Sequence, residues 1–140
     1  MDYKFYDTCA LLDKGVDAFQ EKVVISSITL QELENIKTSN RKDETTKFAA
    51  RQILHALNEH EHEVHIFKPH MLDKFADFEE TNDIKILATA FDYDYNVHPD
   101  ETIFVTNDLA LKAIANLYFG EDSIQSVGEN LDEYTGYQER

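Results

Sequence analysis

The stretch Tyr3–Leu12 (YKFYDTCALL) joins a short apolar strand, an acid with a hydroxyl, and the start of an apolar helix. Phe5 and Tyr6 are typical of a buried strand, and Ala10 begins a helical run that we expect to end at Gly15. Asp7 lies where the strand passes into the helix. An Asp at such a position often caps the helix, so local structure alone accounts for Asp7.

The rest of the chain repeats this alternation of strand and helix. Further strands are predicted over residues 22–25, 64–67 and 102–105, and a final short one over residues 123–127. Helices are predicted over residues 28–38, 43–59 and 82–91, with a short helix or turn over residues 71–78 and a last helix that carries Leu111, Ile114 and Leu117 and ends at Gly120. This pattern predicts an α/β domain with a mostly parallel sheet, whose sites form beyond the carboxyl ends of the strands.

Length and composition favour one globular domain. The chain has 140 residues, and we expect residues 1–127 to fold and residues 128–140 to form an acidic tail or linker. Cysteine occurs once, so no internal disulfide can form, and no apolar run approaches the ~20 residues of a membrane-spanning helix. These features predict a cytoplasmic protein; they leave its oligomeric state open, with a homo-oligomer among the expected assemblies.

The net charge of −15 is unevenly distributed. Residues 1–70 carry a net charge of −3 and residues 71–140 carry −12. An acidic chain repels phosphate, but the first half contains a basic cluster: Lys37, Arg41, Lys42, Lys47 and Arg51. Lys47 and Arg51 share one side of a predicted helix and could bind phosphate, although a solvated helix face explains them equally well.

Three further acids occupy positions comparable to that of Asp7. Asp83 opens a predicted helix, and Asp108 follows a predicted strand. Glu32 shares a helical stripe with Ile28 and Ile36, where a carboxylate is costly unless it has a partner or reaches water. If the four acids converge at one edge of the sheet, a cation is needed to offset their repulsion. Oxygen-only ligands suit Mg²⁺ or Mn²⁺.

Four segments resemble the successive motifs of PIN domains, in the order of that family and over most of residues 1–118. They are Asp7–Leu12 (DTCALL), Leu30–Lys37 (LQELENIK), Asn82–Ala90 (NDIKILATA) and Val105–Lys112 (VTNDLALK). The chain looks most like the PIN domain that precedes a PhoH-like ATPase domain, because Leu131–Tyr137 (LDEYTGY) resembles the linker found there.

This resemblance implies a three-layer α/β/α sandwich and a metal-dependent ribonuclease that uses Mg²⁺ or Mn²⁺ to hydrolyse single-stranded RNA. It implies that the catalytic metal ligands are Asp7, Glu32, Asp83 and Asp108, with Thr106 supporting the site. It also implies an attached or partner ATPase domain. Cys9 departs from the Asn usual at its position of the first motif, which suggests an alternative: a weakly active or inactive RNA-binding or regulatory module attached to an ATPase or helicase.

Two other readings of the sequence are weaker. Several histidines lie between residues 55 and 70, which invites a zinc site, but Val64 stands where the metalloprotease pattern begun by His60 requires a second His. An aspartyl phosphatase would need a second Asp two residues after Asp7, and Cys9 occupies that position. We therefore favour a solvated turn for the histidines and a nuclease-type site for Asp7.

Overall fold

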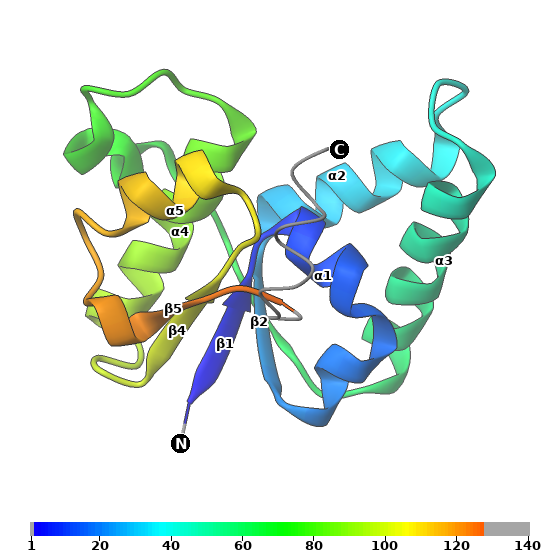
Figure 1. Cartoon of the computed structure of the whole chain (residues 1–140), viewed down its shortest axis with the longest axis horizontal. Helices are drawn as coiled ribbons and strands as arrows, with labels where there is room; N and C mark the ends of the chain where they lie inside the picture. Colours follow the sequence, from blue (N-terminus) through cyan, green and yellow to red (C-terminus); the bar gives the residue numbers. More distant parts are fainter. Residues whose placement is uncertain (1, 128–140) are drawn as a thin grey trace.

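A parallel five-stranded sheet runs through the centre of the computed structural model, which describes residues 2–127 (Figure 1). The strand order is β3-β2-β1-β4-β5, and each neighbouring pair is parallel. The strands are β1 (Tyr3–Tyr6), β2 (Lys22–Ser26), β3 (Glu63–His65), β4 (Thr102–Val105) and β5 (Ile124–Gln125). The predicted mostly parallel α/β fold is therefore confirmed.

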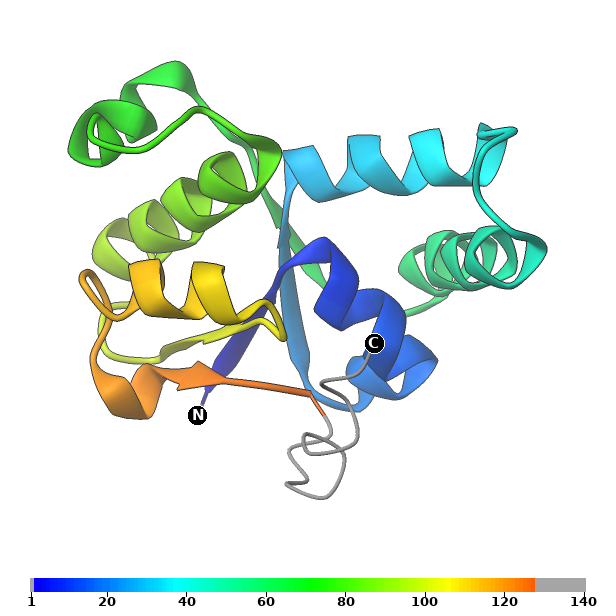
Figure 2. The ribbon, with the colours of Figure 1, turned by 45° about the horizontal axis from the view of Figure 1, so that its top comes forward.

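Helices cover both faces of the sheet (Figure 1). The α-helices are α1 (Thr8–Lys14), α2 (Ser27–Thr38), α3 (Glu44–Glu59), α4 (Asn82–Asn96) and α5 (Leu109–Ala115). Short 3₁₀ segments are η1 (Gly15–Gln20), η2 (Pro69–Phe75) and η3 (Glu121–Ser123). The helices α1 and α3 lie on one side of the sheet and α4 and α5 on the other, as the turned view in Figure 2 also shows.

Alternating strand residues divide the core between these two faces. Phe5, Val24 and Phe104 are fully buried among apolar residues of α4, α5 and η2. Tyr6 and Ile25 point to the opposite face and pack with residues of α1, α2 and α3. Strands buried on both faces explain the nearly continuous apolar runs in the sequence.

The third strand is shorter than predicted, because it ends at His65 and leaves Ile66 and Phe67 outside the sheet. The backbone N–H of Phe67 donates to the hydroxyl of Ser27 at 2.9 Å instead of continuing the ladder. Pro69 then begins η2. A proline has no N–H to donate, so the chain turns away from the sheet at this point.

The last helix also departs from the prediction. Helix α5 ends at Ala115, and Gly120 precedes η3 with an ordinary φ of −68°. The chain leaves the helix early and buries Phe119 on Phe104, with their rings stacked at 5.9 Å. Leu117, which we expected on the buried face, is consequently 70% exposed.

The expected tail, including the linker-like segment Leu131–Tyr137, lies outside the described residues. The division into a domain over residues 1–127 and a tail therefore stays a prediction. None of the helices within residues 2–127 has the length and apolar character needed to cross a membrane.

Candidate metal-binding active site

The sheet topology brings two of the predicted acids to neighbouring strands. From β1 the chain crosses to β2 on one side, and it later returns to β4 on the other side of β1. The carboxyl ends of β1 and β4 therefore form a topological switch point, which is where open α/β sheets bind ligands. Asp7 follows β1 directly. Asp108 is the N-cap residue just before α5, two residues after Thr106, which follows β4.

Asp7 is almost completely buried, with 3% of its surface exposed. One carboxylate oxygen, Oδ1, accepts the backbone N–H of Ala10 at 2.8 Å and so caps helix α1. The other oxygen, Oδ2, accepts the hydroxyl of Thr106 at 2.5 Å. The helix-cap interpretation is thus correct for one oxygen, and the second oxygen turns toward the end of the neighbouring strand.

Thr106 connects the two acids at this edge. Its hydroxyl donates to Asp7 and accepts the backbone N–H of Asp108 at 3.0 Å. Asp108 in turn accepts the N–H groups of Ala110 and Leu111 through one oxygen, Oδ1, and caps α5. A single buried hydroxyl therefore fixes the spacing between the segments that carry Asp7 and Asp108.

Glu32 is held at both of its carboxylate oxygens. The Thr8 hydroxyl donates to Oε1 at 2.5 Å, and the Asn82 amide donates to Oε2 at 3.2 Å. Asn82 is the residue before Asp83 at the start of α4, so this contact links the second and third motifs. These partners explain how a carboxylate can lie beside the apolar stripe of α2.

The carboxylates interact electrostatically even where they share no hydrogen bond. Burial raises the pKa of Asp7 to about 6, and the charges of Asp83 and Asp108 add to this rise, while the bonds from Thr106 and Ala10 oppose it. The pKa of Asp83 is raised by partial burial and by the charges of Asp108 and Glu32. Each of the four predicted acids is therefore repelled by at least one of the others, and we call these four residues the acidic cluster.

The donor set fits a hard divalent cation. Within residues 2–127, no three or more His, Cys, Asp or Glu side chains are placed so that they could together hold a metal ion. Mg²⁺ does not need such a group, because it keeps several waters and binds proteins through one or two carboxylates. The carboxylate oxygens of the predicted acids repel one another around the buried Asp7, and a divalent cation would offset this repulsion.

The structure does not join Lys47 and Arg51 to this cluster. The Lys47 ammonium lies 3.4 Å from Glu44, one turn earlier in α3. The Arg51 guanidinium lies 5.9 Å from the ring of Phe48, and both side chains are exposed. The contacts of both residues thus lie within α3 itself, and their role in binding substrate stays a prediction.

Cys9 lies in the first turn of α1 and is exposed. Partial burial of its sulfur and the charges of Asp7 and Asp83 raise the pKa of the thiol to about 11. Cys9 is therefore a neutral thiol at pH 7 at the rim of the carboxylate cluster, and it is not set up to act as a nucleophile.

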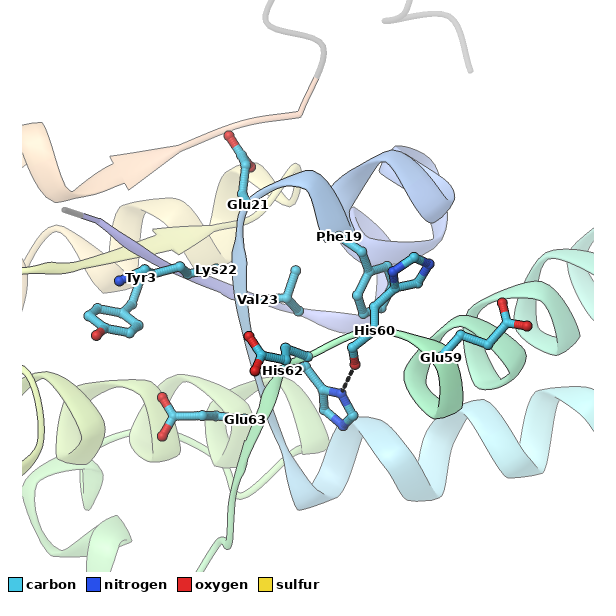
Figure 3. A pocket seen from close by; sticks show the side chains of 10 residues that line it. Tyr3, Phe19, Glu21, Lys22, Val23, Glu59, His60, His62 and Glu63 are labelled. Atoms are coloured by element: carbon cyan, nitrogen blue, oxygen red, sulfur yellow. Dashed lines mark hydrogen bonds between the residues drawn. The ribbon is translucent and has the colours of Figure 1, made fainter.

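Residues 59–63, the central part of the histidine-rich stretch, line a pocket of about 590 Å³. Tyr3, Lys22 and Glu63, the first residues of β1, β2 and β3, line it, so it lies at the opposite edge of the sheet from the four acids (Figure 3). Figure 3 shows the rings of His60 and His62 pointing in different directions.

The contacts of the two histidines explain their directions. His60 stacks on Phe19, and Nδ1 of His62 lies 2.9 Å from the carbonyl oxygen of His60. Farther along, His65 pairs with Asp92 at 2.8 Å. Structural contacts thus account for these three histidines, and the described residues form no metal-binding group here.

The sequence reasoning missed Thr8 and Asn82. Each is a polar residue directly beside a predicted acid, and each donates to Glu32, which lies 24 or 50 residues away in the chain. The only sequence signal for Thr8 and Asn82 was that each lies next to a predicted metal ligand. Their partner could not be identified without the tertiary arrangement.

Comparisons with known proteins agree with this fold. The sequence profile of the PIN domain family matches residues 5–118. Among solved structures, a chain of VapBC2 from Rickettsia felis, crystallised bound to a DNA fragment from their promoter, is similar, with a TM-score of 0.54 and 16% sequence identity. The similarity covers 89% of this chain and 98% of that one. No curated protein matches the sequence significantly.

Proposed function

The chain belongs to the PIN domain family, whose members are generally nucleases, and we propose that it is a metal-dependent ribonuclease acting on single-stranded RNA. The observation that supports this proposal most strongly is the link from Asp7 through Thr106 to Asp108 at the topological switch point. The charges of Asp83 and Glu32 complete an acidic cluster there.

We propose that the four acids hold Mg²⁺ or Mn²⁺. When bound, such an ion polarises a phosphate oxygen and lowers the pKa of its water ligand, which makes a nucleophile at neutral pH. Thr106 keeps Asp7 and Asp108 in register, while Thr8 and Asn82 orient Glu32. Since the pKa of Asp7 is about 6, this carboxylate is ionised and ready to bind a cation above that pH.

Substitution of single acids tests the proposal. We expect Asp7→Asn and Asp108→Asn each to lower Mg²⁺- or Mn²⁺-dependent cleavage of a labelled single-stranded RNA by at least about 100-fold, because outer-sphere partners of metal sites alone are worth 10–100-fold. Circular dichroism should show an unchanged fold. Asp17→Asn, at an exposed acid of η1, is the matched control and should cleave like the wild type.

Normal cleavage by both site variants would show that the activity resides elsewhere.

A second candidate function follows from Cys9, which replaces the Asn amide of the family motif with a neutral thiol at the rim of the site. Under this second candidate function, the chain is an RNA-binding or regulatory module with little catalytic activity. RNA binding by the wild type without metal-dependent turnover would support it, and Cys9→Asn would then be expected to gain activity.

The attached or partner ATPase domain stays a prediction. The residues that suggested it, Leu131–Tyr137, lie outside both the family match and the described part of the chain.

A further inference from the structure

One polar stripe of helix α4 packs along the carboxyl ends of β2 and β3. Its members are spaced by three or four residues and so share one helix face. Each contacts a different segment: Asn82 donates to Glu32, Lys85 lies near Phe67, Thr89 accepts from Ser26, and Asp92 pairs with His65. Lys85 therefore lies one helical turn from the Asn82–Glu32 contact.

The partner of Lys85 on this stripe is an aromatic ring that the backbone holds in place. Phe67 follows β3, and its N–H donates to the hydroxyl of Ser27, the first residue of α2. The Phe67 side chain is half-buried against the core, and its neighbour Ile66 is 54% exposed. An apolar surface thus lies just beyond the carboxyl end of β3, at the same edge of the sheet as the acidic cluster.

Lys85 supplies a positive charge at this surface in a strongly acidic protein. Its ammonium lies 5.9 Å from the centre of the Phe67 ring, and none of the ion pairs formed within residues 2–127 involves it. Lys68, the next residue after Phe67, is also exposed. A polyanion that approaches the four carboxylates needs nearby cations to offset their repulsion.

We infer that Phe67 and Lys85 form a platform for one nucleotide of single-stranded RNA beside the acidic cluster. The base lies against the Phe67 ring, and Lys85 swings from the ring to the adjoining phosphate. Stacking on an aromatic ring requires an unpaired base and tolerates any base, since every base has a π-face. This inference rests on the proposed function for its substrate class, and it adds a physical cause for the preference for single strands and the expectation that no sequence is preferred.

Equilibrium binding separates the two contacts. The probe is a fluorescent oligouridine, measured by fluorescence polarisation in EDTA, where the proposed metal-dependent cleavage does not consume it. We expect Phe67→Leu to weaken its binding about 5- to 10-fold and Phe67→Tyr to bind like the wild type, because leucine keeps apolar bulk without a π-face. An abasic oligonucleotide of the same length should bind wild type and Phe67→Leu equally.

Lys85→Gln should weaken binding of both probes and reduce the slope of log K against log salt by about 1, as expected for one lost phosphate contact. The matched control is Phe48→Leu on α3, because Phe48 has a cation at the same distance, with the Arg51 guanidinium 5.9 Å from its ring. Helix α3 contributes none of the four acids, so Phe48→Leu should bind both probes like the wild type.

The platform is disproved if Phe67→Leu binds oligouridine like the wild type, if it loses equal affinity for the abasic probe, or if Phe48→Leu loses as much. Thermal melting of each variant shows whether it is folded, and Lys85→Gln tests the platform if Phe67→Leu is not. The proposed function is judged separately. If Phe67→Leu weakens binding of oligouridine but not of the abasic probe, and the wild type cleaves no RNA, the ribonuclease is refuted and the platform is supported.

Discussion

At the scale of the residue, the two carboxylate oxygens of Asp7 have different roles. Oδ1 caps helix α1 through Ala10, and Oδ2 accepts from Thr106 at the switch point. Its burial beside Asp83 and Asp108 raises its pKa, so the ionised form is held at a cost in stability. Such a cost is typical of a site arranged for function rather than for folding.

This cost predicts that Asp7→Asn stabilises the metal-free protein. The folded pKa of about 6 lies above the ordinary value of 3.8, so ionised Asp7 disfavours the folded state. The contribution of the Asp7 carboxyl to the free energy of unfolding is therefore fully present below pH 4, where it is protonated, and is lost as the pH rises through 6. In EDTA at pH 8 we expect Asp7→Asn to raise the free energy of unfolding by about 1–3 kcal/mol.

Urea denaturation at pH 4.5, 6 and 8 measures this difference, which should shrink toward the lowest pH. Asn keeps an oxygen for the Ala10 cap, while its amide nitrogen replaces the oxygen that accepts from Thr106, so the substitution removes the charge and this one hydrogen bond. Asp17→Asn, in exposed η1, should change stability little at any of these pH values. A variant less stable than the wild type at pH 8 would show that the buried charge is compensated.

At the scale of the element, the two glycines within residues 2–127 have different roles. Gly15 ends α1 with φ of 70° and ψ of −156°, a backbone region essentially restricted to glycine. Gly120 precedes η3 with φ of −68°, which any residue can adopt. The sequence predicted a helix end at both positions, and only Gly15 has the backbone geometry that requires glycine.

We expect Gly15→Ala to destabilise the fold by about 1–2 kcal/mol, because an alanine Cβ is strained at positive φ even though no atom lies within 4 Å of it. Gly120→Ala is the matched control, since it also has open space around its Cβ. It should leave stability unchanged or raise it by up to about 1 kcal/mol. Thermal unfolding of the two variants measures the difference, and equal effects would contradict the assigned role of Gly15.

At the scale of the whole molecule, the topology concentrates negative charge at one sheet edge. Asp7, Glu32, Asp83 and Asp108 come from four separate motifs and interact electrostatically there. Their helices pack on both faces of the sheet, so the folded core forces the charges together. A cation that relieves this repulsion should therefore stabilise the whole domain.

We expect Mg²⁺ or Mn²⁺ to raise the melting temperature of the wild type. At a concentration tenfold above the dissociation constant, binding to the folded state contributes about 1.4 kcal/mol, or roughly 4 °C. Asp7→Asn and Asp108→Asn should lose most of this shift, and Asp17→Asn should keep it. Differential scanning calorimetry at constant ionic strength measures the shift, and equal shifts in all four proteins would place the ion elsewhere.

The sequence by itself determined the elements and the position of each acid within its motif. Apolar periodicity and caps are local properties, so β1, β2, β4, α2 and α3 followed from them. The same local signals failed where a distant contact decided the outcome. The Phe67 N–H donates to Ser27 and not to a neighbouring strand, so the third strand ends early. Stacking of Phe119 on Phe104 shortens the last helix.

Only the tertiary structure decided which side chains hold the acids. Thr106 lies 99 residues from Asp7, and Asn82 lies 50 residues from Glu32. Such contacts depend on strand order and register, which are set by the packing of the entire core and have no signature in any short stretch. Tyr3–Leu12 supplied the strand, the cap and the helix; the parallel neighbour β4 brought Thr106 to Asp7.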